Sequence, residues 1–210
     1  MEQLEWIKII EKSRVHPLPG ATAQYQMAPL SRRHEGTLQA NYRNSAVMIA
    51  LCQDAHLNPF IPLIVRNEYL GVHSGQVSFP GGKVEAGDES FEQAAKRECI
   101  EEIGLGGLST IRALTPLYIP VSNFLVHPFV SLLENNAPEF SPNKREVNKV
   151  IRFYIEDLLS ASTKEKTDIK VGELVLNVPV FKVEDHLIWG ATAMMLSELK
   201  ALLSEVYETL

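Results

Sequence analysis

The sequence predicts an α+β fold, in which one mixed β-sheet is packed between α-helices and is preceded by an N-terminal helical extension. Short runs of β-branched and aromatic residues alternate with turn residues through most of the chain. A strongly patterned helix lies among these runs, and a second long helix is predicted at the end of the chain. Strands that mostly precede and follow one central helix favour a mixed sheet covered by helices.

The composition is that of an ordinary globular chain. Its 210 residues suffice for one domain with a sizeable core, and the 45% of hydrophobic residues is typical of such domains. The net charge of −6 argues against a nucleic-acid-binding surface, which usually carries a basic stripe. No apolar run is long enough to span a bilayer, and the amphipathic N-terminal segment does not resemble a signal peptide. We therefore expect a cytoplasmic enzyme that acts on a small molecule and binds neither nucleic acid nor membrane.

The N-terminal part is predicted to be a helix followed by an irregular arm. Apolar residues recur at helical spacing over 3–13, whereas 14–44 is rich in Pro, Gly, Gln and Arg. Arg33, next to Arg32 in this arm, reaches an anionic ligand in one interpretation. In the other interpretation, which the sequence supports equally, both arginines are solvated surface residues.

The remaining elements follow in chain order. Two β-rich runs at 46–52 and 60–65, joined by a polar turn, predict a hairpin. Further strands are predicted at 76–79, 108–118, 124–133, 149–155, 174–178 and 180–183, and helices at 90–103, 155–160 and 191–207. Cys52 and Cys99 have apolar surroundings and lack the CxxC spacing, which predicts free buried thiols.

The helix predicted over 90–103 carries three carboxylates on one face. At about 100° per residue, Glu98, Glu101 and Glu102 lie side by side. Like charges at this spacing repel one another unless a positive charge offsets the cost. A hard divalent cation, which prefers carboxylate oxygens, is the natural partner. This pattern makes metal-assisted chemistry on a phosphate the leading hypothesis.

The residues around these carboxylates fit the same hypothesis. Gly81 and Gly82 follow a proline and allow the backbone to turn tightly toward a ligand, although an ordinary turn explains an isolated Gly-Gly pair as well. Arg97 precedes Glu101 by four residues, within reach of an ion pair that either orients a ligating carboxylate or is a surface salt bridge. Gly104 stands where a helix C-cap is expected.

The segment 82–105 resembles the Nudix box, Gly-x5-Glu-x7-Arg-Glu-U-x-Glu-Glu-x-Gly-U, where U is a bulky apolar residue. Its second half matches as RECIEEIGL, with a cysteine at one U position. The first half carries one extra residue, because counting forward from Gly82 reaches Asp88 and counting back from Arg97 reaches Glu89. Coenzyme A-type members often show this longer spacing with an Asp, which favours Asp88 and leaves Glu89 open.

The resemblance implies hydrolysis of a nucleoside diphosphate linked to another group. It implies Mg²⁺ or Mn²⁺ bound by Glu98, Glu101, Glu102 and, as a further ligand, the Gly81 carbonyl. Arg97 and Glu98 are then catalytic, with Glu98 a candidate general base. Glu146, in the loop SPNKREVNK, is a second candidate, because some Nudix enzymes place a catalytic Glu on a late loop. A solvated Glu explains that position equally well.

The stretch before the box, RNEYLGVHSGQVSFPGG, resembles the extended signature of coenzyme A pyrophosphatases. Arg66, Gly75 and the FPGG run match this signature, whereas Gly71 stands where it has a second arginine and Asn67 where it has a small residue. The later segments PLYIPVSNFLVHPFV and IWGATAMML also look like that subfamily.

The leading hypothesis is a metal-dependent pyrophosphatase that converts coenzyme A or acyl-CoA into (acyl-)phosphopantetheine and adenosine 3′,5′-bisphosphate. Expected substrate-binding residues are Arg66, Gly82, Asp88 and Arg33. The glycine at position 71 leaves an ADP-ribose, ADP-sugar or dinucleotide pyrophosphatase as the alternative. A catalytically silent Nudix-like module that binds a nucleotide is a rival from another class, against which the complete set of helix glutamates argues.

The resemblance also sets the expected domain organisation. Residues 45–210 are expected to form the Nudix domain, with the box at 82–105, and residues 1–44 to be a helix and arm of the same domain. A homodimer formed through this arm is a further expectation.

Overall fold

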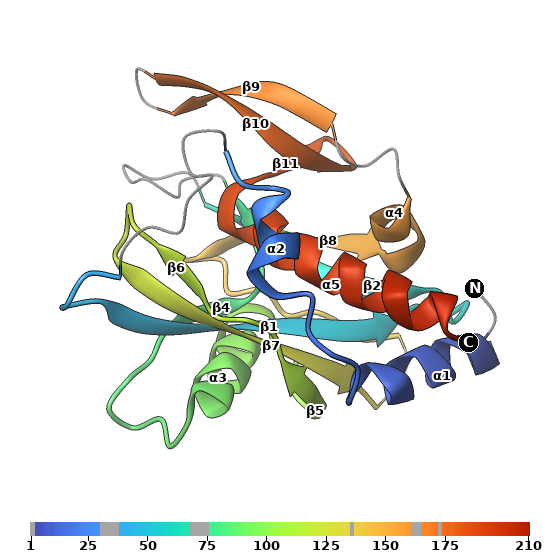
Figure 1. Cartoon of the computed structure of the whole chain (residues 1–210). Helices are drawn as coiled ribbons and strands as arrows, with labels where there is room; N and C mark the ends of the chain where they lie inside the picture. The colour runs from blue at the N-terminus through green and yellow to red at the C-terminus, as the bar shows by residue number, and fades with distance from the viewer. Residues whose placement is uncertain (1–2, 30–37, 68–75, 135–136, 161–164, 172–173) are drawn as a thin grey trace.

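The structure is a computed structural model that describes residues 3–29, 38–67, 76–134, 137–160, 165–171 and 174–210. Within these ranges a mixed sheet of eight strands lies between helices, and a smaller sheet of three strands lies beside it (Figure 1). The elements are α1 Gln3–Ser13, α2 Gly20–Tyr25, β1 Arg43–Gln53, β2 Pro59–Arg66, β3 Val77–Ser78, β4 Gly81–Lys83, α3 Phe91–Ile103, β5 Leu108–Ala113, β6 Leu117–Ile119, β7 Phe124–Leu133, β8 Val147–Tyr154, α4 Ile155–Leu159, β9 Glu165–Val171, β10 Leu174–Val183, β11 His186–Ile188 and α5 Gly190–Glu208.

The large sheet is built around β1. This strand runs parallel to β7, in the register Arg43↔Phe124 to Leu51↔Leu132. It also pairs antiparallel with β2 and with β4. β8 and β3 continue the sheet from β2, while β5 and β6 pair antiparallel with β7. The predicted hairpin of β1 and β2 and the predicted mixed sheet are therefore confirmed.

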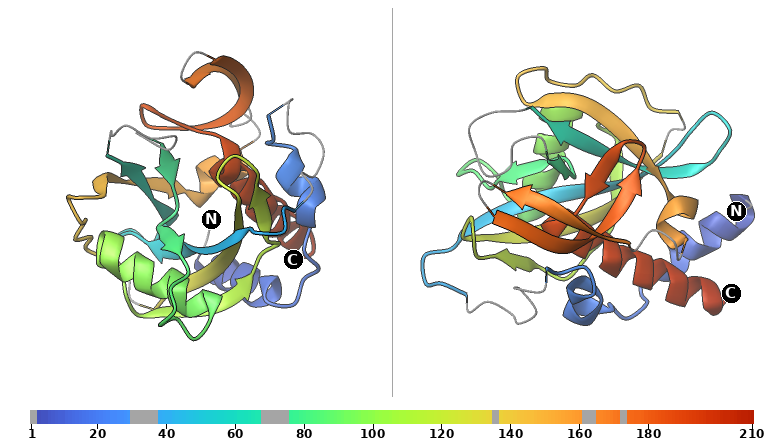
Figure 2. Two further views of the ribbon diagram at one scale, coloured as in Figure 1. Left: turned by 90° about the vertical axis from the view of Figure 1, so that its left-hand side faces the viewer. Right: turned by 90° about the horizontal axis from the view of Figure 1, so that it is seen from above.

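Both faces of the sheet are buried. Side chains alternate between the two faces along each strand, so one strand contributes to both cores. In β1, Met48 and Ala50 face a core shared with α3, whereas Ile49 and Leu51 face a larger core shared with α5. Figures 1 and 2 show this layering, with α3 on one side of the sheet and α5 on the other. Burial on both faces explains why β1 and β2 are nearly continuous apolar runs.

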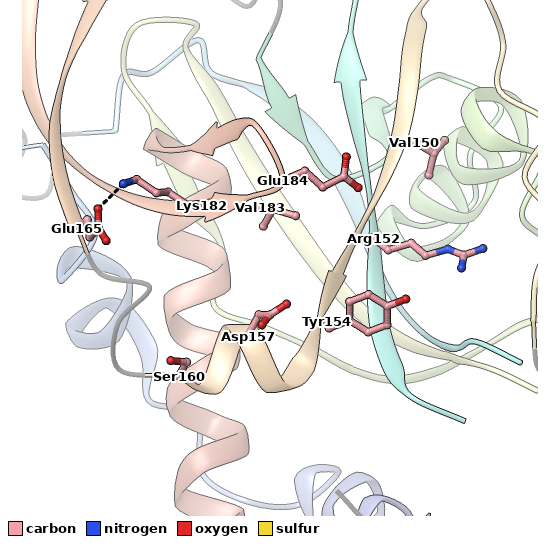
Figure 3. A pocket seen from close by; sticks show the side chains of 9 residues that line it. All are labelled: Val150, Arg152, Tyr154, Asp157, Ser160, Glu165, Lys182, Val183 and Glu184. Atoms are coloured by element: carbon pink, nitrogen blue, oxygen red, sulfur yellow. Dashed lines mark hydrogen bonds and ion pairs between the residues drawn. The ribbon is translucent and has the colours of Figure 1, made fainter. Parts of the chain in front are cut away.

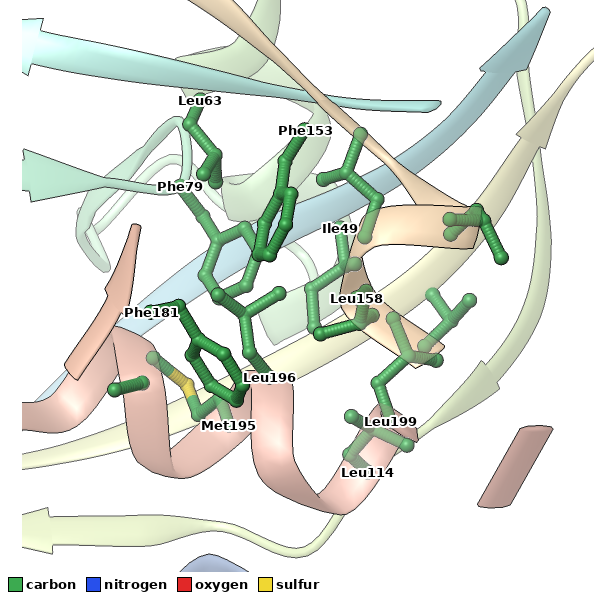
Figure 4. Packing of buried hydrophobic residues seen from close by; sticks show 14 of the residues in the cluster. Ile49, Leu63, Phe79, Leu114, Phe153, Leu158, Phe181, Met195, Leu196 and Leu199 are labelled. Atoms are coloured by element: carbon green, nitrogen blue, oxygen red, sulfur yellow. The ribbon is translucent and has the colours of Figure 1, made fainter. Parts of the chain in front are cut away.

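The larger core lies between the sheet and α5. Aromatic rings of Phe79, Phe153 and Phe181 pack there against Ile49 and Leu196 (Figure 4). Trp6 of α1 and Met27 after α2 belong to the same buried cluster, and both N-terminal helices contact α5. No helix within the described ranges is long and apolar enough to cross a membrane.

A buried carboxylate links the N-terminal segment to the sheet. Glu198 of α5 is fully buried and accepts hydrogen bonds from Gln24 Nε2 at 2.8 Å and from Thr115 Oγ1 at 2.6 Å. The Thr115 backbone N–H also donates to it, at 3.2 Å. The carboxylate thus links α2 to the β5–β6 connection. Removing it would leave buried donors from both segments without this acceptor.

The structure corrects two strand predictions. The strand expected over 108–118 is divided into β5 and β6, because the Thr115 N–H donates to Glu198 instead of a neighbouring strand and Pro116 has no N–H. The two strands expected around Pro179 are one strand, β10, in which this residue lies near the point where pairing with β9 ends and pairing with β11 begins.

Four further elements were not predicted, among them the short strand β11, which pairs with the end of β10. β9 is rich in Glu, Lys and Asp, residues that are depleted in strands, and it forms by pairing with β10. α2 lies inside the arm that was expected to be irregular, which is therefore a wrong prediction for 20–25. β4 contains Gly81 and Gly82, so the expected turn is instead a short strand paired with Ala46 and Val47.

Replacement of Glu198 by alanine is expected to destabilise the fold. The change leaves the Gln24 amide and the Thr115 donors buried without their acceptor, at a cost of roughly 3 kcal/mol in the free energy of unfolding. Urea denaturation measures the loss. Glu208→Ala, an exposed position on the same helix, is the matched control and is expected to change stability by less than about 0.5 kcal/mol. Equal stabilities of the two variants would contradict the role given to the buried carboxylate.

Candidate active site

Helix α3 begins and ends where the sequence predicts. Ser90 is its N-cap, and the Ser90 hydroxyl accepts a hydrogen bond from the Gln93 N–H at 3.1 Å. Gly104 closes the helix in the left-handed conformation, with φ of 70°. The buried residues Ala95, Cys99 and Ile103 dock the helix on the sheet. Both cysteines are free and buried, as expected.

The three glutamates of α3 do not share one environment. Glu102 is 1% exposed and lies on the face that docks against the sheet. The side chain of Glu98 is 14% exposed, and that of Glu101 is 56% exposed. The carboxylates therefore spread from the buried edge of the helix to its solvent side, which helical spacing alone does not reveal.

Arg97 contacts three carboxylates. Its guanidinium binds Asp88 with two hydrogen bonds, each 3.0 Å long, in the geometry of a bidentate pair. Nη1 also donates to Glu98 Oε1 at 3.0 Å and to Glu101 Oε2 at 3.1 Å. Of the two acids that the sequence left open, Asp88 contacts the arginine. Glu89 donates its backbone N–H to the Gln93 side chain.

Both glycines of β4 lie where other atoms approach the backbone too closely for a side chain. The Gly81 N–H donates to Glu102 Oε2 at 2.8 Å, and a Cβ at this position would lie 2.5 Å from the Ala46 carbonyl oxygen. A Cβ at Gly82 would lie 2.3 Å from Glu98 Oε1. The missing side chain at Gly82 therefore makes room for the Glu98 carboxylate, and the missing side chain at Gly81 makes room for strand β1, while the Gly81 N–H binds Glu102.

Arg66, at the end of β2, reaches the same place from the other side. Its Nη2 donates to the Gly81 carbonyl oxygen at 3.3 Å and lies 3.6 Å from Glu102 Oε1. Its Nε donates to the Ser78 hydroxyl at 3.3 Å. Ser78 was not predicted as a site residue. Strand alternation could have identified it. Val77 and Phe79 on either side of it are buried in the core shared with α5, so the Ser78 side chain points to the other face of the sheet.

The loop that carries Glu146 is docked on the end of α3. The backbone N–H groups of Ser141 and Asn143 donate to the carbonyl oxygens of Ile103 and Glu102, both at 2.9 Å. These bonds satisfy helix carbonyls that otherwise lack partners. The Glu146 carbonyl accepts a hydrogen bond from the Asn67 N–H at 3.1 Å, and the negative charge of Glu146 contributes to the raised pKa of Glu98 and of Glu102.

Burial dominates the electrostatics of the site. It raises the pKa of Glu102 to about 7, although the Arg66 charge and the Gly81 N–H both act in the opposite direction. Burial also raises the pKa of Glu98, against the opposing effect of Arg97. The hydrogen bonds from Arg97 hold the pKa of Asp88 below its ordinary value. The site therefore contains carboxylates tuned in opposite directions.

The donor chemistry of this cluster suits a hard divalent cation. Glu98, Glu101, Glu102 and the Gly81 carbonyl offer only oxygen, which such ions prefer. In the described part of the chain, however, no three acidic, His or Cys side chains are grouped as a ready metal cage. Arg97 pairs instead with Glu98 and Glu101, and Arg66 with Glu102.

Other predicted site residues lie outside the described residues. These are Arg33 of the arm and, from the extended signature, Gly71 and Gly75.

A separate pocket of about 690 Å³ lies between β8, α4 and β10 (Figure 3). Its lining mixes cations such as Arg152 and Lys182 with anions such as Asp157 and Glu184, and it shares no residue with the cluster around α3. This mixture favours no single class of ligand.

A domain model described as the NUDIX domain matches residues 42–174. The chain belongs to the Nudix family. Curated relatives agree with this: an uncharacterized Nudix hydrolase, NudL, of Yersinia enterocolitica is 32% identical over 173 residues, which cover 81% of this chain and 86% of the relative. NudL of Yersinia pestis is 32% identical over 169 residues, covering 79% of this chain and 82% of the relative.

Solved structures support the fold of this Nudix protein. The Nudix hydrolase RenU from M. smegmatis has a TM-score of 0.55 at 14% identity, covering 85% of this chain and 94% of that chain. A MutT/nudix family protein from Enterococcus faecalis has a TM-score of 0.51 at 14% identity, covering 88% of this chain and 73% of that chain. The predicted α+β Nudix fold is confirmed.

The protein is thus a Nudix hydrolase, an enzyme class that acts on nucleoside diphosphate derivatives and generally uses divalent ions such as Mg²⁺ or Mn²⁺.

Gly82→Ala is expected to lower the hydrolytic activity at least tenfold while the protein stays folded. The added methyl group displaces the Glu98 carboxylate, which would otherwise lie 2.3 Å from it, and misplaced catalytic groups lose rates of that order. Steady-state rates with the best nucleotide substrate measure the effect. Gly87→Ala is the matched control, because nothing lies within 4 Å of a Cβ there. Equal activity of the two variants would argue against a role for the Gly82–Glu98 contact.

In metal-free protein, Glu102 is expected to make stability fall as the pH rises. Its folded pKa of about 7 lies above the ordinary value of 4.5, so the neutral carboxyl favours folding. This contribution, about 3 kcal/mol at about 1.4 kcal/mol per pH unit, is complete below pH 4.5 and is lost as the pH passes 7. Denaturation in EDTA at pH 5 and pH 8 compares wild type with Glu102→Gln, which does not titrate. Parallel losses in both proteins would contradict the assignment to Glu102.

Proposed function

We propose that this Nudix hydrolase cleaves the pyrophosphate bond of coenzyme A or acyl-CoA, giving (acyl-)phosphopantetheine and adenosine 3′,5′-bisphosphate. The observation that carries the reaction type is the meeting of Glu98, Glu102 and the Gly81 peptide at one end of α3, with Arg66 beside them and the loop of Glu146 docked on the same helix end. This combination of oxygen donors and an arginine suits a metal-bound diphosphate.

The chemistry follows from the charges. A pyrophosphate is protected from hydroxide by its own negative charge, which bound divalent ions neutralise while they acidify a water molecule. Glu98 is the proposed general base, because burial raises its pKa and a more basic carboxylate accepts a proton more readily. Arg97, anchored by Asp88, keeps Glu98 oriented. Glu146 is the alternative base, since its loop is docked on the same end of α3 and its charge contributes to the raised pKa of Glu98.

The choice of substrate rests on the extended signature ahead of the box. Arg66, its first arginine, lies at the proposed metal ligands, and the run from Phe79 to Gly82 brings the β4 backbone to the helix carboxylates. The glycine at position 71 favours the second candidate, a pyrophosphatase of ADP-ribose, ADP-sugars or dinucleotides. Mg²⁺ and Mn²⁺ are both proposed cofactors, and a homodimer in the cytoplasm is the proposed form of the enzyme.

Product analysis tests the proposal. Purified protein is incubated with coenzyme A, ADP-ribose and a dinucleoside polyphosphate, each with Mg²⁺, with Mn²⁺ or with EDTA, and the products are separated by chromatography. We expect metal-dependent formation of adenosine 3′,5′-bisphosphate and phosphopantetheine from coenzyme A. A Glu98→Gln variant is expected to lose at least 100-fold in kcat, the range typical of a lost general base. Preference for ADP-ribose would overturn coenzyme A as the proposed substrate. Hydrolysis of none of the three nucleotides would favour the catalytically silent module.

A further inference from the structure

The guanidinium of Arg66 bridges two proposed metal ligands. Its Nη2 is 3.3 Å from the Gly81 carbonyl oxygen and 3.6 Å from Glu102 Oε1. The other oxygen of Glu102 is held by the Gly81 N–H at 2.8 Å. One positive charge therefore already stands between the two oxygens to which a divalent ion would bind.

A divalent ion held by Glu102 and the Gly81 carbonyl would compete with this guanidinium for the same oxygens. Hard cations bind carboxylate and carbonyl oxygens at about 2.0–2.6 Å, so an ion held by both oxygens would lie within a few ångströms of Nη2. Like charges at that separation repel strongly inside a protein. Since Glu102 is 1% exposed, little water is present to screen them.

Of the two arginines at the site, Arg66 is the one that can leave. Arg97 is tied to Asp88 by two hydrogen bonds between full charges. The further side-chain partner of Arg66 is the neutral hydroxyl of Ser78, at 3.3 Å. Glu102 is its one carboxylate within ion-pair distance among the residues that the structure describes, and its side chain is 27% exposed.

We infer that Arg66 takes the place of the metal ion in the metal-free enzyme, and that metal binding releases its guanidinium to the substrate phosphates. Arg66 is in this view a counter-charge that is exchanged for the metal, and a phosphate ligand only afterwards. The inference rests on the proposed function, because it takes Gly81 and Glu102 as metal ligands. It makes Arg66 a residue with opposite effects on metal binding and on substrate binding.

Titration with Mn²⁺ alone tests the exchange. Wild type and Arg66→Gln are titrated without substrate by calorimetry, and KM is then measured with whichever of coenzyme A and ADP-ribose is cleaved. We expect the variant to bind Mn²⁺ roughly tenfold more tightly, a typical size for coupled binding, and to show a roughly tenfold higher KM. If Arg66 had a merely structural role, the variant would bind both Mn²⁺ and the substrate more weakly.

Lys149→Gln is the matched control for the loss of one positive charge. Lys149 lies opposite Val65, next to Arg66 in the sheet, and its ammonium pairs with Glu184 at the surface. Its Mn²⁺ affinity is expected to stay within about twofold of wild type, because exposed charges are screened. Ser78→Ala, which removes the neutral partner of Arg66, is expected to tighten Mn²⁺ binding about two- to threefold. It decides the question alone if Arg66→Gln does not fold.

The possible failures are distinguishable. Wild-type protein that neither binds Mn²⁺ nor hydrolyses a nucleotide would overturn the proposed function, and this inference with it. A metal-dependent hydrolase in which neither Arg66→Gln nor Ser78→Ala binds Mn²⁺ more tightly than Lys149→Gln would overturn the exchange alone.

Discussion

The arrangement of the site depends on how the buried carboxylate of Glu102 is compensated. This carboxylate lies in the last turn of α3, where the helix carbonyls already create negative potential, and it is almost fully removed from water. The Gly81 N–H and the Arg66 guanidinium offset part of this cost. The Ser141 and Asn143 N–H groups also cap the carbonyls of the same turn. Because compensation comes from three separate segments, all three must be positioned together.

The sheet supplies that positioning. β1 is paired on one side with β4, in the register Ala46↔Gly82, so the strand holds the two glycines under the helix that docks on it. β2 ends at Arg66, where its register against β8 shifts. Arg66 lies opposite Val147, the residue that follows Glu146 in the chain. The Asn67 N–H and the Glu146 carbonyl are joined at 3.1 Å. The elements that carry Arg66, Gly81, Glu98 and Glu146 are thus neighbours in one sheet-and-helix unit.

The sequence predicts the parts of this unit whose patterns are local. The helix with Arg97 and its glutamates, the apolar runs of β1 and β2 and the cap at Gly104 follow from spacing and turn chemistry. Spacing does not reveal which glutamate is buried, because that depends on how α3 docks on strands distant in sequence. For the same reason the strand pairing of Gly81 was missed, and the charged strand β9 was hidden by its composition.

The acid that pairs with Arg97 is oriented by a turn in the loop before α3. The Asp88 N–H donates to the Glu85 carbonyl, and the Glu85 N–H donates to Asp88 Oδ2 at 2.8 Å, so these residues form a closed turn. This turn directs the Asp88 carboxylate at Arg97. The turn thus fixes Arg97 by a full charge pair, whereas the side-chain contacts of Arg66 among the described residues are the Glu102 carboxylate, the Gly81 carbonyl and the neutral hydroxyl of Ser78. Two arginines that both neutralise the helix glutamates differ in this way in how easily a metal ion can replace them.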